Sequence, residues 1–304
     1  MEHAILVTGC SGMIGAAAVD ALAARGAPAW ACGRDDADLL RPGAAVDLIR
    51  RTRPETLVHC AWDMRAEAIT DEATQGAWVE ASLDLLDAFG RAGGRHAVVI
   101  GTCAEYAWNG GCLVEDKTPL QPRTVYGRAK QSLRERATEL ATAQGWTLAW
   151  PRVFWVYGPR ERPGRLVPSV VAALLAGAQV PCTHGRQERD YLYSGDVGHA
   201  VAALALQGYE GPVNVASGNP VAVRDIVRAF ATELGRPDLI NWGALPVRPD
   251  EPARLMGDAR RLTKAVPDWS PMPLSEGVRQ TVAWWRRCRI ARDTKRVSPQ
   301  HPNQ

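Results

Sequence analysis

The sequence predicts an α/β protein built on a doubly wound parallel sheet, with a smaller C-terminal lobe. Over the first 160 residues, short apolar runs alternate with alanine-rich or amphipathic stretches, and a glycine-rich turn follows the first apolar run. Proline and arginine become frequent after Pro159. Strands that alternate with helices form a parallel sheet with right-handed crossovers, so we expect ligands to bind at the carboxyl ends of its strands.

Length and composition are those of one large globular domain or two closely packed ones. The 304 residues are 46% hydrophobic and 23% charged, and the net charge is +3. No basic block interleaved with aromatic residues occurs, which argues against nucleic acid as a partner. The seven cysteines have no CxxC or CxxH spacing, so we expect reduced thiols and no metal. No apolar run reaches the roughly 18 residues of a membrane span, and we expect a cytoplasmic protein without a membrane partner.

The first strand, over residues 4–7, leads into the turn TGCSGMIG and a helix over residues 16–25. Gly9 permits a tight turn, Gly12 lets backbone N–H groups approach a diphosphate, and Gly15 allows close packing of helix on strand. An ordinary βα turn is the alternative interpretation of this GxxGxxG pattern. The residues predicted to bind the diphosphate are Gly9, Ser11, Gly12, Met13, Ile14 and Gly15.

The second strand, over residues 29–32, ends in Gly33 and Arg34. A guanidinium at this place suits the 2′-phosphate of NADP(H), which is therefore favoured over NAD(H). Asp35 and Asp36 follow directly and weaken the positive charge, so a solvated charge cluster is the alternative. Further contacts with the dinucleotide are predicted at Asp38 and Leu39, beside the adenine, and at Cys60, Ala61 and Trp62, after the third strand.

The remaining elements of this half follow in order. We expect a helix over residues 43–53, a strand over 56–60, a helix over 71–93, a strand over 97–100, a helix over 126–144 and a strand over 147–156. The helices 71–93 and 126–144 carry enough alanine and leucine to pack against their copies in a homodimer.

Tyr126 and Lys130 lie one helical turn apart on one face of the helix. A phenol titrates near pH 10, and a neighbouring ammonium lowers its pKa, so Tyr126 can act as a general acid or base. Thr102, at the end of the strand over residues 97–100, brings a hydroxyl to the same place. An exposed helix face is the alternative interpretation of this YxxxK spacing.

We expect a dinucleotide-binding domain over residues 1–160, to which residues 190–216 return with a helix over 194–207 and a strand over 213–216. Residues 161–293 are expected to form mainly a substrate-binding lobe. The polar, proline-containing segment 294–304 is expected to be a flexible tail.

Residues 8–15, Thr102, Tyr126 and Lys130, in one strand and helix order, resemble the extended short-chain dehydrogenase/reductases. The resemblance is to the NAD-dependent epimerase/dehydratase family, in its branch that acts on nucleotide-diphosphate sugars, and it extends to about residue 287. It implies a Rossmann-type fold, with Thr102, Tyr126 and Lys130 as the catalytic residues and Lys130 and Val153 also near the dinucleotide. It also implies substrate contacts at Cys103, Ala104, Trp155, Leu166, Pro168, Arg189, Arg248 and Arg254. Arginines that converge in this lobe suit a diphosphate, whereas each arginine alone also suits an exposed surface.

The sequence departs from the family pattern at three positions. Cys103 and Ala104 stand where the 4,6-dehydratases have an Asp-Glu pair. Ala104 also takes the place of the cysteine that serves epimerisation in GDP-fucose synthase-like enzymes, and we interpret Cys103 as structural. Trp155 stands where many relatives have asparagine.

Without the residues for dehydration and for epimerisation, the resemblance leaves hydride transfer as the expected chemistry. It therefore implies an NADPH-dependent reductase of a 4-keto nucleotide-diphosphate sugar, as used in deoxysugar biosynthesis. Tyr126 would protonate the alkoxide while Lys130 holds the nicotinamide ribose and Thr102 the carbonyl oxygen. An NAD-dependent 4-epimerase, a reductase of non-nucleotide ketones and a non-catalytic dinucleotide-binding sensor are the alternatives.

Overall fold

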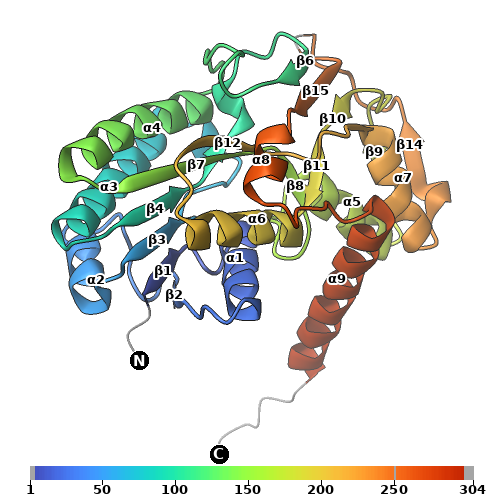
Figure 1. Ribbon diagram of the computed structural model, residues 1–304. Helices are drawn as coiled ribbons and strands as arrows, with labels where there is room; N and C mark the ends of the chain where they lie inside the picture. Colours follow the sequence, from blue (N-terminus) through green and yellow to red (C-terminus); the bar gives the residue numbers. More distant parts are fainter. Residues whose placement is uncertain (1–3, 250, 298–304) are drawn as a thin grey trace, which may run out of the picture.

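A parallel sheet of seven strands forms the centre of the molecule (Figure 1), in a computed structural model that describes residues 4–249 and 251–297. The strand order is β12-β7-β4-β3-β1-β2, with the short β5 beside β7, and every pairing in it is parallel. This confirms the predicted doubly wound sheet. Its strands are β1 (Ile5–Thr8), β2 (Trp30–Cys32), β3 (Thr56–His59), β4 (His96–Val99), β5 (Gly101–Thr102), β7 (Thr147–Val153) and β12 (Gly211–Val215).

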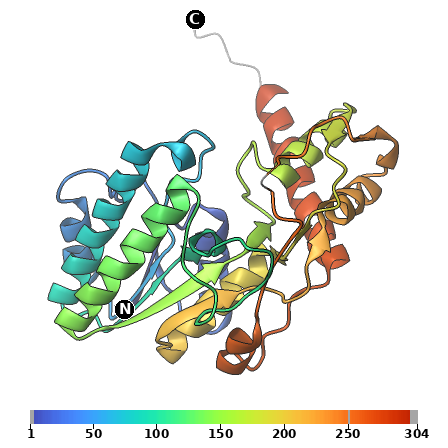
Figure 2. The same ribbon diagram turned by 90° about the horizontal axis from the view of Figure 1, so that it is seen from above.

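Helices cover both faces of this sheet (Figures 1 and 2). One face carries α1 (Met13–Ala24) and α6 (Ser194–Gln207), and the other carries α2 (Ala44–Thr52), α3 (Glu72–Arg91) and α4 (Val125–Gln144). The helices α1 and α6 approach closely because small residues meet between them. A Cβ atom on Gly198 would lie 2.4 Å from the Ala17 carbonyl oxygen.

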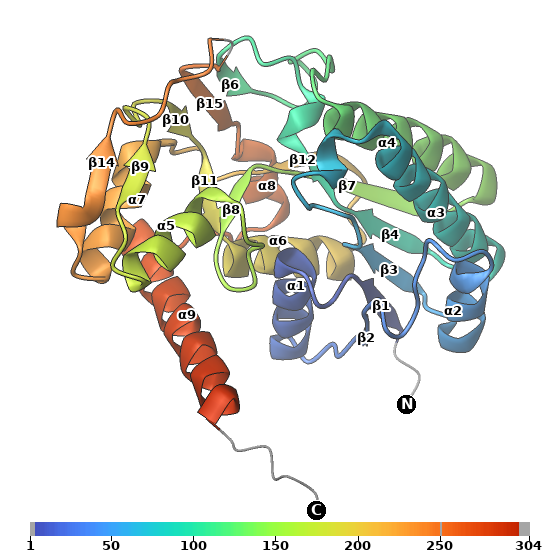
Figure 3. The same ribbon diagram turned by 180° about the vertical axis from the view of Figure 1, so that it is seen from behind.

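The second lobe packs α5 (Leu166–Leu175), α7 (Val223–Glu233) and α9 (Leu274–Val297) around a core of its own. The strands β8 (Trp155–Tyr157) and β11 (Tyr191–Tyr193) pair with each other, and they lie with α5 between the main sheet and α7 (Figure 3). The remaining paired strands are β6 (Gly111–Leu113), β9 (Val180–Cys182), β10 (Glu188–Arg189), β13 (Val221–Ala222), β14 (Ile240–Trp242) and β15 (Arg254–Gly257). The short helices are η1 (Ala68–Thr70), η2 (Cys103–Glu105), η3 (Pro237–Leu239) and α8 (Arg260–Ala265).

Asp190 ties the two lobes together. It is fully buried, and one carboxylate oxygen accepts hydrogen bonds from the Ser217 N–H at 2.7 Å and the Ser217 hydroxyl at 2.6 Å. The other oxygen accepts from the N–H groups of Gly218 at 3.0 Å and Gly257 at 3.1 Å. This one side chain therefore fixes β10, β15 and the segment after β12 relative to each other.

The predicted bounds of domains and strands can be compared with the structure at three segments. Residues 190–216 supply α6 and β12 to the main sheet. The strand expected over 147–156 divides at Phe154, because the N–H of Trp155 bonds to Asp190 and β8 pairs with β11. The helix α9 includes residues 294–297 of the segment that we expected to be a tail, and residues 298–304 lie outside the described residues.

Within the described ranges, none of the helices is long and apolar enough to cross a membrane.

Candidate functional site

The glycine turn between β1 and α1 packs closely against the chain's own backbone. Gly9 has φ of 71°, and a Cβ atom there would lie 2.6 Å from the Ala61 N atom. A Cβ atom on Gly15 would lie 2.2 Å from the Gly9 carbonyl oxygen. Gly12 is the N-cap of α1, with no side-chain cap, so N–H groups of the first helical turn are free to bind an anion. These features fit the diphosphate of a dinucleotide, and Ser11, Met13 and Ile14 lie in the same turn.

The end of β2 carries both positive and negative groups. Arg34 is exposed, and among the described residues it makes no hydrogen bond or ion pair. The Asp36 carboxylate accepts a hydrogen bond from the Gly33 N–H at 2.8 Å, which places an acid in the turn itself. The Asp38 carboxylate accepts from the Leu40 N–H, and Leu39 is buried.

The Thr102 side chain lies close enough to the Tyr126 phenol to lower its pKa, so the structure brings together two of the three predicted catalytic groups. Thr102 is buried at the end of β5, where it is paired in register with Val153 of β7. Tyr126 is half-buried in the first turn of α4. Lys130, one turn further, is buried and donates a hydrogen bond from Nζ to the Ile100 carbonyl oxygen at 2.9 Å.

The pKa of Tyr126 is raised in this structure, whereas we expected a neighbouring Lys130 to lower it. Burial raises the pKa of the Tyr126 phenol, and the Thr102 side chain opposes this only in part. The Nζ atom of Lys130 is directed to the Ile100 carbonyl and to the ring of Trp62. Burial also lowers the pKa of Lys130 itself to about 7. The phenol therefore stays protonated at neutral pH and is suited to donate a proton.

Glu105 anchors Thr102 through contacts that the sequence reasoning missed. Its Oε1 accepts from the Thr102 N–H at 2.8 Å and from the Trp150 indole at 3.0 Å. Its Oε2 accepts from Arg152 Nε at 2.8 Å, and both charged side chains are almost completely buried. Thr102 and Glu105 also form a capping box around η2. The Thr-x-x-Glu spacing was the available sequence signal for this arrangement.

The two residues after Thr102 carry no carboxylate. Cys103 is buried, and burial raises the pKa of its thiol, so it is neither a nucleophile nor a base at neutral pH. Cys103 packs in a core cluster with Tyr106 and Phe154, which supports the structural role expected for it. Ala104 is also buried.

Arg189, on β10, is a buried arginine of the second lobe. Its guanidinium donates to Glu251 at 2.8 Å and to the Glu188 carbonyl oxygen at 2.7 Å, and it lies 5.5 Å from the ring centroid of Trp155. Burial, and to a smaller extent the charge of Arg248, lowers the pKa of Arg189, whereas Glu251 opposes this. Arg189, Arg248 and Trp155 are thus brought together, with Glu251 as an acidic neighbour that we did not predict.

Arg254 does not converge with Arg189. In the parallel pair of β10 and β15, Arg254 is opposite Glu188 and bonds to it at 3.2 Å, whereas Arg189 is opposite Leu255. Successive residues of a strand point to opposite faces, so the two arginines lie on different faces of this small sheet. Leu166 begins α5 with its side chain partly exposed, and Pro168 is buried in the first turn.

Glu161 is a second acidic group that we did not predict, and no spacing in the sequence pointed to it. Its Oε2 is buried and, among the described residues, has no hydrogen-bond partner. Burial raises the pKa of Glu161 to about 8, and the charge of Arg165 opposes the rise. The charge of Arg165 acts on Tyr126, and the charge of Glu161 acts on Tyr191.

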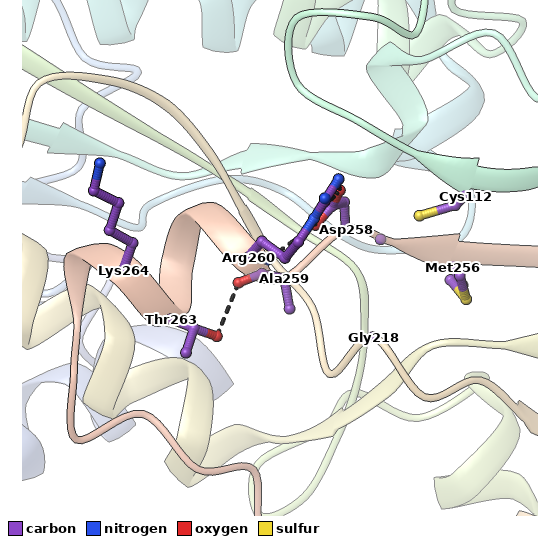
Figure 4. A pocket seen from close by; sticks show the side chains of 9 residues that line it. Cys112, Gly218, Met256, Asp258, Ala259, Arg260, Thr263 and Lys264 are labelled. Carbon is purple, nitrogen blue, oxygen red and sulfur yellow. Dashed lines mark hydrogen bonds and ion pairs between the residues drawn. The ribbon is translucent and has the colours of Figure 1, made fainter.

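Two open cavities, of about 660 and 590 Å³, lie beside α8 and away from these residues. The first cavity is lined in part by Cys112, Met256 and Lys264 (Figure 4). Arg260 and Asp258, which form an ion pair, line both cavities. None of the residues predicted for the site lines either cavity. We therefore place the chemistry at Tyr126 and not in these hollows.

The comparison with known proteins agrees with this geometry. Residues 5–216 match the NAD dependent epimerase/dehydratase family. The chain is similar to dTDP-4-dehydro-6-deoxy-D-allose reductase of Streptomyces bikiniensis, with 27% identity over 93% of this chain and 96% of the reductase. It is 26% identical to CDP-abequose synthase of Salmonella muenchen, over 43% of this chain and 46% of that protein, so this second match spans about half of each.

A solved structure of a sugar-nucleotide enzyme also has the same fold over most of this chain. The UDP-glucose 4-epimerase of Thermus thermophilus, in complex with NAD, superposes with a TM-score of 0.81 at 25% identity, covering 93% of this chain and 98% of that one. The family match covers most of the chain and includes the glycine turn, Thr102, Tyr126 and Lys130. The chain therefore belongs to the NAD dependent epimerase/dehydratase family of enzymes, and its cofactor is a nicotinamide dinucleotide.

Proposed function

We propose that the protein reduces the ketone of a 4-keto nucleotide-diphosphate sugar with NADPH. The observation that carries this proposal is a protonated phenol, Tyr126, beside the Thr102 side chain and one helical turn from a buried lysine. Reduction of a ketone needs a proton donor at the oxygen, and a half-buried phenol with a raised pKa supplies one.

Each residue then has a definite part. Bound NADPH would supply the hydride to the ketone carbon. Tyr126 would donate its proton to the developing alkoxide, and the Thr102 hydroxyl would hydrogen-bond the same oxygen. Lys130 would hold the nicotinamide ribose with those of its N–H donors that Ile100 does not use.

Elimination is less well supported than reduction. It needs an acid and a base beside the hydroxyl residue, and positions 103 and 104 are a buried thiol and a methyl group. The nearest carboxylate in sequence, Glu105, is held by Thr102, Trp150 and Arg152. The similarity to a 4-dehydro-sugar reductase over almost the whole chain supports the same choice.

A nucleotide diphosphate is the substrate class that the second lobe supports. Arg189 is aligned by Glu251 and Trp155, and Arg248 lies within electrostatic range. A guanidinium held in this way can bind phosphate oxygens when its carboxylate partner turns away. Arg34, which is exposed and unpaired among the described residues, supports NADPH over NADH.

An NAD-dependent 4-epimerase is the second candidate, because Asp36 places a carboxylate in the turn after β2 and a similar 4-epimerase binds NAD. Such an enzyme must first remove a proton from the sugar hydroxyl. The raised pKa of Tyr126 opposes that step.

Two measurements on the purified protein separate the candidates. We expect no tightly bound dinucleotide after purification, and oxidation of added NADPH on mixing with a 4-keto-6-deoxy sugar nucleotide. A thermal-shift series with UDP, dTDP, GDP and CDP in the presence of NADP would identify the nucleotide first. Copurified NAD, together with interconversion of sugar nucleotides without added cofactor, would contradict the reductase and establish the epimerase.

A further inference from the structure

The surroundings of Lys130 contain an aromatic partner that the proposed reaction has not used. Lys130 is only 3% exposed, and its Nζ lies 3.6 Å from the centroid of the Trp62 ring. The same atom donates to the Ile100 carbonyl oxygen at 2.9 Å. An ammonium removed from water is unfavourable unless such groups compensate it. A ring face within about 6 Å of a cation attracts it electrostatically, and most strongly when the ring belongs to tryptophan.

Trp62 is itself held in a fixed orientation. Its indole N–H donates to Gln75 Oε1 at 2.9 Å, and Gln75 Nε2 donates to the Ala68 carbonyl oxygen at 3.1 Å. The ring also packs against Trp78, with centroids 6.0 Å apart, and meets Tyr126 edge to face at 6.4 Å. The indole plane beneath Lys130 is therefore set by α3 and η1.

We propose that Trp62 is a positioning residue whose indole face holds the Lys130 ammonium against the Ile100 carbonyl, beside the ring of Tyr126. The inference rests on the proposed function only for the roles of Lys130 and Tyr126. The contact of ring and ammonium stands without it.

The other titratable groups that face Lys130 come from two elements besides its own helix. The Glu105 carboxylate of η2 and the Cys60 thiol after β3 favour the charged ammonium, but burial outweighs them and lowers the pKa of Lys130 to about 7. His59 is neutral, because burial and the charge of Lys130 lower its pKa to about 3. On α4 itself, Tyr126 is a neutral phenol. In the described part of the chain, the Trp62 ring and the Ile100 carbonyl are the recorded partners of Nζ.

The chain offers matched variants for a test. Trp62→Leu removes the ring face and the indole hydrogen bond, while Trp62→Phe removes the hydrogen bond but keeps a smaller aromatic ring. Trp78→Leu is the control, because Trp78 is equally buried and contacts Trp62 but has no recorded ring contact with Lys130. Its indole N–H also has no partner among the described residues, so the control breaks no hydrogen bond.

The sequence also makes a direct measurement practical, since it contains only four lysines: Lys117, Lys130, Lys264 and Lys295. With ¹³C-labelled lysine, the Cε signal of each can be followed by NMR as a function of pH, and Lys130→Met assigns the signal of interest. The titration uses the folded protein without substrate. It is therefore independent of whether the enzyme is a reductase or an epimerase, and activity assays test that question separately.

We expect the titration midpoint of Lys130 to fall by about one pH unit in Trp62→Leu, because the charged form loses its ring partner. In Trp62→Phe and Trp78→Leu it should stay within about 0.3 units of the wild-type value. If Trp62→Leu does not fold, Trp62→Met takes its place with the same expectation. The proposal would be overturned if the titration midpoint of Lys130 were unchanged or raised in Trp62→Leu. It would also be overturned if the midpoint fell as far in Trp78→Leu as in Trp62→Leu.

Discussion

At the scale of single residues, burial decides the chemistry of the site. It keeps the phenol of Tyr126 protonated and lowers the pKa of Lys130 to about 7, so neither side chain behaves as it would in water. From the helical spacing we predicted that the two residues would lie together. The direction of the pKa shift of Tyr126 could not be predicted, because it depends on how deeply the folded chain buries the phenol and on the neighbouring Thr102 and Glu105, which come from other elements.

Arg34 carries the expected preference for NADPH. A guanidinium that binds the 2′-phosphate should contribute about 1.5–3 kcal/mol, or about ten- to a hundredfold in affinity. Arg34→Ser should therefore raise the dissociation constant for NADPH by that factor and leave the constant for NADH almost unchanged. Fluorescence titration with both nucleotides measures this. A wild-type protein that binds NADH as tightly as NADPH would refute the preference and favour the epimerase.

Glu161 should make the stability of the protein depend on pH. Burial raises its pKa from 4.5 to about 8, so between these values the folded protein keeps a proton that the unfolded chain has released. Stability then falls as pH rises through this window, by at most about 1.4 kcal/mol per pH unit. Glu161→Gln, which stays neutral, should lose this slope.

Urea unfolding at pH 5, 6.5 and 8 compares the two proteins. The free energies of unfolding should be similar at pH 5, and the variant should be the more stable at pH 8. Parallel pH profiles for wild type and variant would show that the carboxyl is not buried as described.

At the scale of elements, the strands and helices of the first half lie within a few residues of their predicted bounds. The signals there were local, such as the glycine turn before α1 and the apolar run of β3. The individual strands of the second lobe could not be predicted from the sequence, because each short strand pairs with a strand far away in the chain. For example, Arg254 on β15 pairs with Glu188 on β10. The opposite faces of Arg189 and Arg254 follow from that register, which spacing alone does not determine.

The contact between β1 and α1 gives a test of the dinucleotide site. Gly15→Ala would place a methyl group 2.2 Å from the Gly9 carbonyl oxygen, so the turn must open. We expect a loss of at least tenfold in NADPH affinity and of about 1–3 kcal/mol in stability. Gly76→Ala in α3 is the control, since a Cβ atom there meets nothing within 4 Å and a helical alanine should stabilise slightly. Equal NADPH affinity in the two variants would contradict the site.

At the scale of the whole molecule, two lobes meet along the carboxyl edge of the main sheet, where Thr102 ends β5 and β10 carries Arg189. Asp190 fixes that meeting through four hydrogen bonds to Ser217, Gly218 and Gly257. The neighbouring Arg189 is thereby carried on a rigid connection between the lobes. The geometry of the site thus depends on the sheet and the lobe together.

We also expect a homodimer formed by the outer faces of α3 and α4, which lie side by side on the surface (Figure 2). Ala77, exposed on α3, lies where a copy of this helix pair would pack. Ala77→Arg should convert the dimer to a monomer in sedimentation velocity, whereas Val46→Arg, on the exposed side of α2, should leave it intact. A wild-type monomer of 33.0 kDa at micromolar concentration would exclude this assembly.

The most direct test of the proposed function is the turnover of Tyr126→Phe with NADPH and a 4-keto sugar nucleotide. This substitution keeps the ring and removes the hydroxyl that Thr102 contacts. We expect the rate to fall by about 10²–10⁴, with NADPH affinity and melting temperature close to those of the wild type. A Tyr126→Phe protein that reduces the same ketone at nearly the wild-type rate would contradict the account, since another group would then have to donate the proton.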